Sequence, residues 1–384
     1  MIIPFYFGGK DRLRVAVIGG GYAGFAAIAA IREYRKDAEI TLIDPRSAQL
    51  KITHLQTIFG RKHNNISVSF SDLASRFRFR HVRKSLKFDN EILQLWNDER
   101  VINVEDKQLP FDYLIVAAGS PSKFAESMNN TFTLDDFISH PSTEAFRDKL
   151  QQQDHNGAVI NIVGAGPTGI QFLFEIQKYI RRMSPSPSLR LIDSGEYPLH
   201  QFNPKIGQYV RSKIEQLGIE YLPNHVFLSQ EENVAVLEDL GTEEFKELPS
   251  SLSLIFTGKE RVARYDANMF GQVMVNSETL GRVFVAGDCS RFAGPGSNTM
   301  TAQSAVRKGR LVARNILRMS GHIKLLEPYL HQDMGYIVSL GRSDAIGWIG
   351  VERNVVHGPA ACMAKEMVDG QYDMLLKGYD TYLL

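Results

Sequence analysis

The sequence predicts an α/β fold with two Rossmann-like dinucleotide-binding units and a small C-terminal α+β segment. Two observations carry this prediction. A strand, a GxGxxG turn, a helix, a second strand and an acidic residue follow one another near the start of the chain, and the same order returns 145 residues later. One GxGxxG turn is a weak signal, but two turns that each lie in the full strand–turn–helix–strand context are a strong one.

The first unit consists of two strands and the helix between them, over residues 14–18, 39–43 and 25–31. Gly19 allows the tight turn, Gly21 lets backbone approach a diphosphate, and Gly24 lets the helix pack closely on the strand. The free N–H groups and positive dipole end of the helix favour an anion there. Asp44 follows Gly24 by 20 residues, so we expect its carboxylate to accept hydrogen bonds from ribose hydroxyls. A glycine-rich turn of an ordinary α/β protein is the alternative, which the completeness of both motifs disfavours.

The second unit repeats this order with strands over 158–163 and 189–192 and a helix over 170–180. Gly164, Gly166 and Gly169 form its GxGxxG turn, and Asp193 ends its second strand. A carboxylate at that place fits the two ribose hydroxyls of NAD and repels a 2′-phosphate by a few kcal/mol at contact distance. Because no arginine follows Asp193 closely, the sequence favours NADH over NADPH.

The remaining elements are less regular. We expect short strand-like pieces between residues 77 and 114, including 92–96 and a half-buried strand within the basic-aromatic run 76–84. Further expected elements are a strand over 111–119, a strand over 281–288, a helix over 301–319, strand-like runs over 336–340 and 345–349, and a final helix from about residue 360. Asp288 stands at a strand end before a turn, which is a common ligand-facing place in α/β folds, although a helix N-cap is the competing role.

The composition is typical of a folded protein with a large core. The chain has 384 residues, 43% hydrophobic and 23% charged, which excludes disordered, collagen-like and coiled-coil classes. The 44 Lys and Arg balance the 43 Asp and Glu, so a dedicated nucleic-acid binder is disfavoured. With two cysteines there is no disulfide framework, and we expect a cytoplasmic protein. The apolar run 15–31 contains four glycines and is too short for a membrane span.

The order of five motifs resembles a known group of proteins. GGGYAG, LIVAAGS, GAGPTGIQ, LIFTG and VFVAGD, ending at Gly24, Ser120, Gln171, Gly258 and Asp288, are similar to the motifs of flavoproteins with two dinucleotide-binding domains. Within that group, the runs TAQSA (301–305) and GYIVSLGR (335–342) most resemble type II NADH dehydrogenases, the single-chain NADH:quinone oxidoreductases.

The resemblance implies where each cofactor binds. FAD is expected at Gly19, Gly21, Gly24, Asp44, Gly119, Asp288, Ala302 and Gln303. NADH is expected at Gly164, Gly166, Gly169, Asp193, Thr257 and Gly258. Gln171 and Gln303 are expected to line the place where flavin and nicotinamide meet, as candidate catalytic residues. The resemblance also implies an FAD-binding domain over 1–120 and 266–325, an NADH-binding domain over 121–265, and a C-terminal segment over 326–384.

Two departures from the resemblance concern the electron acceptor. The quinone-reducing relatives usually carry a second glutamine four residues after the first, where this chain has Arg307. They also carry a glutamate after the second glycine motif, where this chain has Gln171, with Glu175 one turn later. A neutral amide cannot relay a proton as a carboxylate can. Cys289 and Cys362 form no CxxC or CxxxxC motif, so dithiol chemistry is excluded, and His54 and His63 have no partner at metal-ligand spacing, so no metal is expected.

The leading hypothesis is hydride transfer from NADH to N5 of FAD, followed by transfer of two electrons to a quinone-like acceptor. Arg307 and Gln171 leave open a second hypothesis, in which oxygen or a specialised small molecule replaces the quinone. A third hypothesis is a slow-turnover, flavin-bound regulatory or interaction protein. The apolar stripe of Met363, Met367 and Leu375 is typical of a packing or dimer surface, and peripheral contact with the cytoplasmic membrane face stays open.

Overall fold

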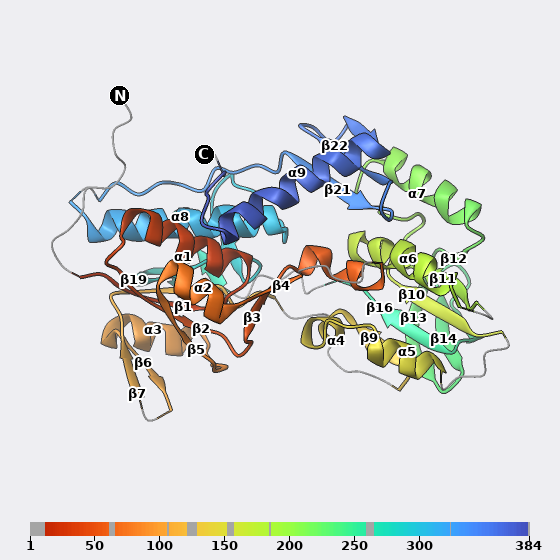
Figure 1. The fold of residues 1–384 in the computed structure, drawn as a ribbon, viewed down its shortest axis with the longest axis horizontal. Helices are drawn as coiled ribbons and strands as arrows, with labels where there is room; N and C mark the ends of the chain where they lie inside the picture. Colours follow the sequence, from red (N-terminus) through yellow and green to blue (C-terminus); the bar gives the residue numbers. More distant parts are fainter. Residues whose placement is uncertain are drawn as a thin grey trace.

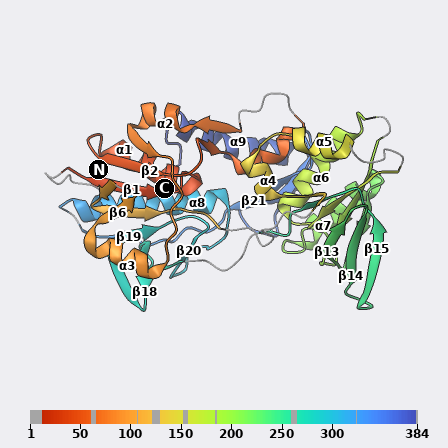
Figure 2. The same ribbon diagram turned by 90° about the horizontal axis from the view of Figure 1, so that it is seen from below.

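A computed structural model describes residues 12–60, 66–105, 107–120, 129–151, 157–183, 186–258, 265–322 and 324–382. His63 lies outside these residues, as does the start of the turn expected at 184–188. The described chain forms two lobes, each built on its own sheet, with the C-terminal helix lying across them (Figure 1). Figure 2 shows the same two lobes from below, with α9 between them.

The first lobe contains an eight-stranded sheet with the strand order β20-β17-β18-β19-β8-β1-β2-β5. Its strands are β1 (Arg14–Ile18), β2 (Glu39–Ile43), β5 (Phe79–Val82), β8 (Tyr113–Val116), β17 (Tyr265–Ala267), β18 (Gln272–Val275), β19 (Glu278–Val285) and β20 (Ser290–Phe292). β5, β2, β1, β8 and β19 are paired in parallel, so their carboxyl ends meet at one edge of the sheet. The buried β-branched and leucine side chains of these strands form one core with the helices that cover them.

Helices α1 (Tyr22–Tyr34) and α8 (Ala302–Ser320) pack against each other over this sheet. A Cβ at Gly309 of α8 would lie 2.1 Å from the carbonyl oxygen of Ala23, so the two backbones are in contact. The smaller elements of the lobe are β3 (Ala48–Leu50), η1 (Ile52–Phe59), β4 (Ser67–Ser69), α2 (Phe70–Phe77), α3 (Asn90–Glu99), β6 (Val101–Val104) and β7 (Lys107–Pro110). Of these, the 3-10 helix η1 lies between the two lobes in Figure 1.

The second lobe contains a five-stranded, all-parallel sheet with the strand order β12-β11-β10-β16-β9. Its elements are β9 (Thr131–Thr133), α4 (Leu134–Ser139), α5 (Glu144–Gln151), β10 (Val159–Val163), α6 (Pro167–Ile180), β11 (Ser188–Ile192), α7 (Pro204–Gln216), β12 (Glu220–Leu222) and β16 (Leu252–Ile255). An antiparallel sheet of β13 (His225–Glu231), β14 (Val234–Asp239) and β15 (Glu244–Pro249) adjoins it.

The C-terminal segment is part of both cores. It forms the antiparallel strands β21 (Gly335–Ser339), β22 (Ala345–Ile349) and β23 (Val355–His357), followed by α9 (Pro359–Leu376). Val338, Ile346 and Trp348 are buried in the core of the second lobe, whereas Tyr372 and Tyr382 are buried in the core of the first. The segment therefore joins the two lobes through buried contacts as well as through the chain.

The main strands and helices expected from the sequence are confirmed to within a few residues. The strand-like reading of 92–96 is wrong, because these residues lie in α3. The carboxylate of Asp89 accepts a hydrogen bond from the backbone N–H of Ile92 and caps that helix, which buries Leu93 and Trp96 on one side. Of the run 76–84, residues 76 and 77 end α2 and only 79–82 form a strand, β5 at the edge of the sheet.

The expected stripe of Met363, Met367 and Leu375 is also wrong. Met363 and Met367 are 69% and 74% exposed, whereas Leu375 is 2% exposed and lies in the core of the first lobe. The two methionines are one turn apart and exposed to solvent, whereas Leu375 packs inward. No helix within the described ranges is long and apolar enough to cross a membrane.

Candidate functional site

The first glycine turn is tightly packed on one side and open on the other. Gly19 has a φ of +96°, and a Cβ there would lie 2.3 Å from the carbonyl oxygen of Ala117. A Cβ at Gly24 would lie 1.9 Å from the carbonyl oxygen of Gly19. By contrast, a Cβ at Gly21 would meet no atom within 4 Å. The turn therefore brings α1 against β1 and leaves free space in front of the helix.

The second turn has the same geometry. Gly164 has a φ of +102°, and a Cβ there would lie 2.5 Å from the carbonyl oxygen of Phe256. A Cβ at Gly169 would lie 1.8 Å from the carbonyl oxygen of Gly164, whereas a Cβ at Gly166 would meet nothing within 4 Å. The two GxGxxG sequences thus produce two equivalent turns, each open where a diphosphate would approach.

Both helices that follow these turns begin without a side-chain cap. α1 and α6 start at Gly21 and Gly166, where no side chain accepts a hydrogen bond from the first turn. Five other helices begin at a residue whose side chain does cap them, namely Ser69, Asp89, Thr133, Asn203 and Thr301. Uncapped N–H groups at the positive end of a helix dipole, with free space in front of them, fit a diphosphate. The residues at both tips therefore fit a dinucleotide.

Asp44 is buried at the end of β2 and is paired with Arg46. Its carboxylate accepts hydrogen bonds from the backbone N–H of Gly20 at 2.7 Å and from Arg46 Nε and Nη2 at 2.9 and 2.6 Å. Burial would raise the pKa of Asp44, but the hydrogen bond and charge of Arg46 outweigh it and hold that pKa below its ordinary value. A ribose at this strand end would meet a carboxylate–guanidinium pair. Sequence reasoning missed Arg46, which follows Asp44 by two residues.

Asp193 occupies the equivalent place after β11. It accepts hydrogen bonds from the backbone N–H of Ala165 at 2.6 Å and of Gly195 at 2.8 Å. The side chain beside it is His200 instead of an arginine, with Nδ1 3.8 Å from Oδ1 of Asp193. No guanidinium within the described residues is paired with Asp193, which agrees with the expectation that this carboxylate faces a cofactor without a 2′-phosphate.

The other residues expected to bind cofactors lie around these two tips. Gly119 and Gly258 follow β8 and β16 with φ values of +76° and +90°, and a Cβ at either would meet nothing within 4 Å. Thr257 precedes Gly258 in its turn. Asp288 follows β19, in a turn that contacts α1, since a Cβ at Gly287 would lie 3.0 Å from that of Ala23. Ala302 and Gln303 form the first turn of α8, which Thr301 caps.

Lys308 is a buried cation beside the Asp288 turn. Its side chain is 1% exposed, and Nζ donates hydrogen bonds to the carbonyl and hydroxyl oxygens of Ser290, both at 3.2 Å, and to Asn298 Oδ1 at 3.0 Å. It thereby ties the turn after β19 to the loop that leads into α8. Burial lowers the pKa of Lys308 to about 8, although the charge of Asp288 opposes this. Nothing in the sequence alone distinguishes this lysine from an exposed one.

Arg307, which replaces the second glutamine, is covered by the end of the chain. Its guanidinium carbon lies 5.6 Å from the ring centre of Tyr382, which is 4% exposed. One turn further along α8, Arg310 pairs with Asp380 at 2.6 Å and also donates to the carbonyl oxygen of Tyr382. The departure at Arg307 is therefore matched by a tail that packs on α8.

Neither cysteine is suited to thiolate chemistry at neutral pH. Both are free, and Cys289 is 1% exposed. Burial raises the pKa of Cys289 to about 11 and also raises that of Cys362. The thiol of Cys289 donates to the carbonyl oxygens of Ala286 and Val116 at 3.5 and 3.7 Å, which is the behaviour of a buried structural cysteine.

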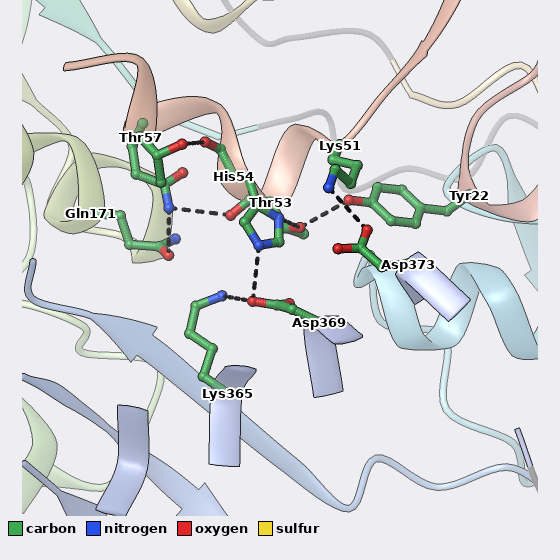
Figure 3. A network of polar contacts seen from close by, with 10 residues as sticks. Tyr22, Lys51, Thr53, His54, Thr57, Gln171, Lys365, Asp369 and Asp373 are labelled. Carbon is green, nitrogen blue, oxygen red and sulfur yellow. Dashed lines mark hydrogen bonds and ion pairs between the residues drawn. The ribbon is translucent and has the colours of Figure 1, made fainter. Parts of the chain in front are cut away.

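The 3-10 helix η1 connects the two halves of the site (Figure 3). Gln56 Nε2 lies 3.4 Å from Gln171 Oε1 on α6, and Thr53 Oγ1 lies 2.9 Å from Tyr22 Oη on α1. Gln171 therefore reaches an element that contacts both glycine-motif helices. Gln303 is on α8, in the other lobe, so the two candidate catalytic glutamines come from different lobes.

A cavity of about 360 Å³, open to solvent on one side, lies beside η1. It is lined by residues of η1, α6, the turn after β21, and α9, and its titratable lining residues include His54, Glu175, Arg342, Lys365, Glu366 and Asp369. Sequence reasoning dismissed His54 and did not find the cavity. The reason is that α9 follows η1 by about 300 residues, and no local pattern indicates that the two helices meet.

Comparisons with known proteins place the chain in a family. The family model described as pyridine nucleotide-disulphide oxidoreductase matches residues 13–309, more than three quarters of the chain. This chain belongs to the pyridine nucleotide-disulphide oxidoreductase family. The predicted fold class, the predicted kinship with two-domain flavoproteins and the prediction of an oxidoreductase are thereby confirmed.

Individual relatives agree along nearly the whole chain. The type II NADH:quinone oxidoreductase of Staphylococcus aureus (strain NCTC 8325 / PS 47) is 24% identical over 396 residues, covering 94% of this chain and 95% of the relative. NDH2 from Plasmodium falciparum, solved in complex with NADH, superposes with a TM-score of 0.78 at 14% identity, over 94% of this chain and 95% of that one. The sulfide:quinone oxidoreductase from Aquifex aeolicus gives 0.74 at 18% identity, over 96% and 92%.

The two kinds of glycine in the second turn predict different outcomes. Gly166→Ala adds a methyl group that meets no protein atom, at a φ of −73° that alanine adopts readily, so we expect an unchanged melting temperature. The methyl group occupies the space that a diphosphate needs, so we expect the dissociation constant for NADH to rise about tenfold or more. Gly169→Ala forces a methyl group onto the Gly164 carbonyl and should lower stability by about 1–3 kcal/mol. Calorimetry and NADH titration measure both; wild-type NADH affinity in Gly166→Ala contradicts the assignment of this tip.

Lys308 predicts a pH dependence of stability. Its pKa is about 8 in the folded chain against an ordinary 10.5, so between these values the unfolded chain binds more protons than the folded one. The free energy of unfolding should therefore gain a contribution of up to about 3 kcal/mol from Lys308 as the pH rises through this range. Urea unfolding of the wild type and of Lys308→Met across the range measures it. We expect the Lys308→Met profile to lack this rise, and parallel profiles contradict the prediction.

Proposed function

We propose that this chain is an FAD-dependent enzyme that takes a hydride from NADH and passes two electrons to a quinone-like acceptor. The observation that carries the proposal is the duplication of one binding arrangement within a single chain. Each copy has an uncapped, open helix tip and a buried aspartate at the next strand end that accepts a hydrogen bond from the turn. Two such tips hold two dinucleotides, and a two-dinucleotide oxidoreductase needs one to carry the hydride and one to receive it.

The residue roles in this proposal follow the geometry. The tip of α1, with Gly21 and the turn of Asp288, would hold the FAD diphosphate. Asp44 would bind its ribose, and Gly119, Ala302 and Gln303 would line the flavin. The tip of α6 would hold the NADH diphosphate and Asp193 its ribose. The remaining NADH contacts would come from Gly164, Gly166, Gly169, Thr257 and Gly258. When bound, FAD supplies a ring that accepts a hydride and later releases electrons.

The two rings would meet beside η1, because this element contacts both glycine-motif helices through Thr53 and Gln56. The protein's contribution to hydride transfer is then to hold the two rings in contact and to exclude water. Gln171 would orient the nicotinamide side and Gln303 the flavin side. Neither amide needs to gain or lose a proton for this purpose.

A quinone-like acceptor is supported by the Staphylococcus aureus relative, which is named a quinone oxidoreductase and matches this chain almost from end to end. Arg307 and its cover Tyr382 support the alternative that the acceptor is oxygen or a specialised small molecule, since they change the acceptor side of α8. The test below separates these acceptors.

The outer surface of the C-terminal segment supports peripheral membrane contact. It exposes several large apolar side chains, namely Met334, Val351, Met363, Met367 and Val368 at 74%, 53%, 69%, 74% and 41%. A quinone with an apolar tail would be delivered from such a surface. The alternative is a homodimer formed through this surface. Membrane contact predicts that the protein sediments together with lipid vesicles, whereas a homodimer predicts the mass of two chains when the protein is sedimented alone.

The proposed function predicts a spectroscopic cycle. The purified protein should be yellow, NADH should bleach its flavin absorbance, and a short-chain quinone added without oxygen should restore it. A colourless protein that cannot be reconstituted with FAD contradicts the proposal. If oxygen restores the flavin absorbance and quinone does not, the acceptor is oxygen and not a quinone.

Asp193 predicts the choice of nicotinamide cofactor. Asp193→Ala removes both the acceptor for ribose hydroxyls and the repulsion of a 2′-phosphate, so the NADH/NADPH ratio of kcat/KM should fall about tenfold or more. Asp193→Asn is the matched control for the loss of the Ala165 and Gly195 hydrogen bonds, because it keeps one acceptor oxygen. An unchanged ratio in both variants removes Asp193 from this role.

A further inference from the structure

The proposed reaction consumes one proton from solvent in each turnover. In balance, NADH + H⁺ + quinone gives NAD⁺ + quinol, so the hydride and one solvent proton together supply the two hydrogens of the quinol. Gln171 cannot carry that proton, because an amide does not titrate in water near neutral pH. The proton therefore comes either directly from water or through other titratable groups of this chain.

A continuous set of polar contacts runs from the tip of α1 through η1 to α9 (Figure 3). Tyr22 Oη lies 2.9 Å from Thr53 Oγ1, and Thr53 Oγ1 lies 3.2 Å from His54 Nδ1. On the other side of the imidazole, His54 Nε2 lies 3.3 Å from Asp369 Oδ2, to which Lys365 Nζ also donates at 2.8 Å. Each of the first three groups can both donate and accept a proton.

The two ends of this set lie in different surroundings. The hydroxyl groups of Tyr22 and Thr53 meet at η1, beside which the two rings are proposed to lie, so one end is at the proposed flavin site. His54, Lys365 and Asp369 line the cavity of about 360 Å³, so the other end is beside a space large enough for water. His54 is also the one titratable side chain among residues 52–59, the element that contacts both glycine-motif helices.

The charges around the imidazole favour this arrangement. Burial would raise the pKa of Asp369, but the hydrogen bond from His54 and the charge of Lys365 outweigh it and keep the carboxylate ionised. An ionised Asp369 holds the Nε2 side of His54 and turns Nδ1 toward Thr53. Burial raises the pKa of Tyr22, so its phenol stays protonated as a neutral hydrogen-bonding group. The other charged groups that line the cavity with His54 are Glu175 of α6, Arg342 after β21 and Glu366 of α9.

We propose that His54 is the proton-relay residue of this enzyme and that Asp369 is its positioning residue, an inference that rests on the proposed function. His54 takes a proton from the cavity at Nε2, beside Asp369, and releases the Nδ1 proton to Thr53 Oγ1. The hydroxyl proton of Thr53 passes to Tyr22 Oη, and the phenol proton of Tyr22 would go to the quinone-like acceptor as the second hydrogen of the quinol. His54, left neutral with its proton on Nε2, returns to the Nδ1–H tautomer before it takes up the next proton.

His54→Gln tests the relay in the FAD-loaded enzyme. Glutamine keeps a hydrogen-bonding side chain but cannot carry a proton near neutral pH. We expect NADH to bleach the flavin at the wild-type rate within about twofold, because the hydride brings no solvent proton with it. We expect reoxidation by quinone to slow at least tenfold at pH 8, with a larger solvent deuterium isotope effect, and to be restored by added imidazole, which fits the cavity.

Three further variants make the result specific. His225→Gln is the matched control, because His225 Nε2 also faces an aspartate, Asp239, at 3.6 Å but lies in the antiparallel sheet of the second lobe. It should leave both half-reactions unchanged. Asp369→Asn should slow reoxidation less than His54→Gln, and Asp369→Glu should recover most of the rate. NMR gives a readout without turnover. The ring resonances of His54 are assigned by their loss in His54→Gln, and their pH titration is then followed in the FAD-free protein. We expect Asp369→Asn to alter that titration.

The outcomes separate the relay from the function on which it rests. A wild-type protein that NADH does not bleach overturns the proposed function itself. With bleaching intact, wild-type reoxidation and an unchanged isotope effect in His54→Gln overturn the relay. The relay is also overturned if Glu175→Gln slows flavin reoxidation by quinone and His54→Gln does not. That result assigns proton entry to Glu175, the neighbouring carboxylate of the same cavity.

Discussion

The rest of the structure depends on the contact between helix and strand backbone at Gly24 and Gly169. Because no side chain separates them, α1 and α6 begin directly at the carboxyl ends of β1 and β10, with their first N–H groups exposed in the turn. A glycine at the N-cap makes a helix less stable than a capping side chain does, by about a few tenths of a kcal/mol. A bound diphosphate would supply the missing acceptors at both tips. The backbone contact at Gly24 and Gly169 therefore both fixes the fold and leaves N–H groups that a diphosphate can bind.

This constraint is local in sequence, which explains how much could be predicted. The GxGxxG spacing, the buried strands on either side and the aspartate after the second strand all lie within about 30 residues, so periodicity and glycine placement suffice to find them. Both turns, both uncapped helices and the hydrogen bonds of Asp44 and Asp193 to Gly20 and Ala165 agree with that reading. The strand assigned to 92–96 failed because the helix cap at Asp89 was not weighed against the apolar pattern.

The parts of the site that could not be predicted depend on contacts between distant segments. Gln49 donates to Tyr372 Oη across 323 residues, and Lys51 pairs with Asp373 across 322. These contacts place α9 on η1 and create the cavity at His54, yet each of the two segments is unremarkable by itself. The same holds for Lys308, whose burial depends on the loops around Ser290 and Asn298. Local sequence patterns are enough to find the nucleotide sites. The groups proposed for proton transfer and for the acceptor side come together only because α9 and the residues after it pack back onto η1 and α8.

The two tips differ in how they are enclosed, and the difference suits one resident and one exchanging ligand. At the first tip, the ring of Tyr22 packs at a tilt of 45° against that of Tyr372 of α9, with the ring centres 4.4 Å apart, and Asp44 is paired with Arg46. The C-terminal helix therefore contacts the first residue of α1, directly beside the first tip. At the second tip, the side chain beside Asp193 is a half-exposed histidine, His200. A ligand that must leave in every turnover is better served by a less covered end, which supports the proposal that the flavin binds at the first tip and the nicotinamide at the second.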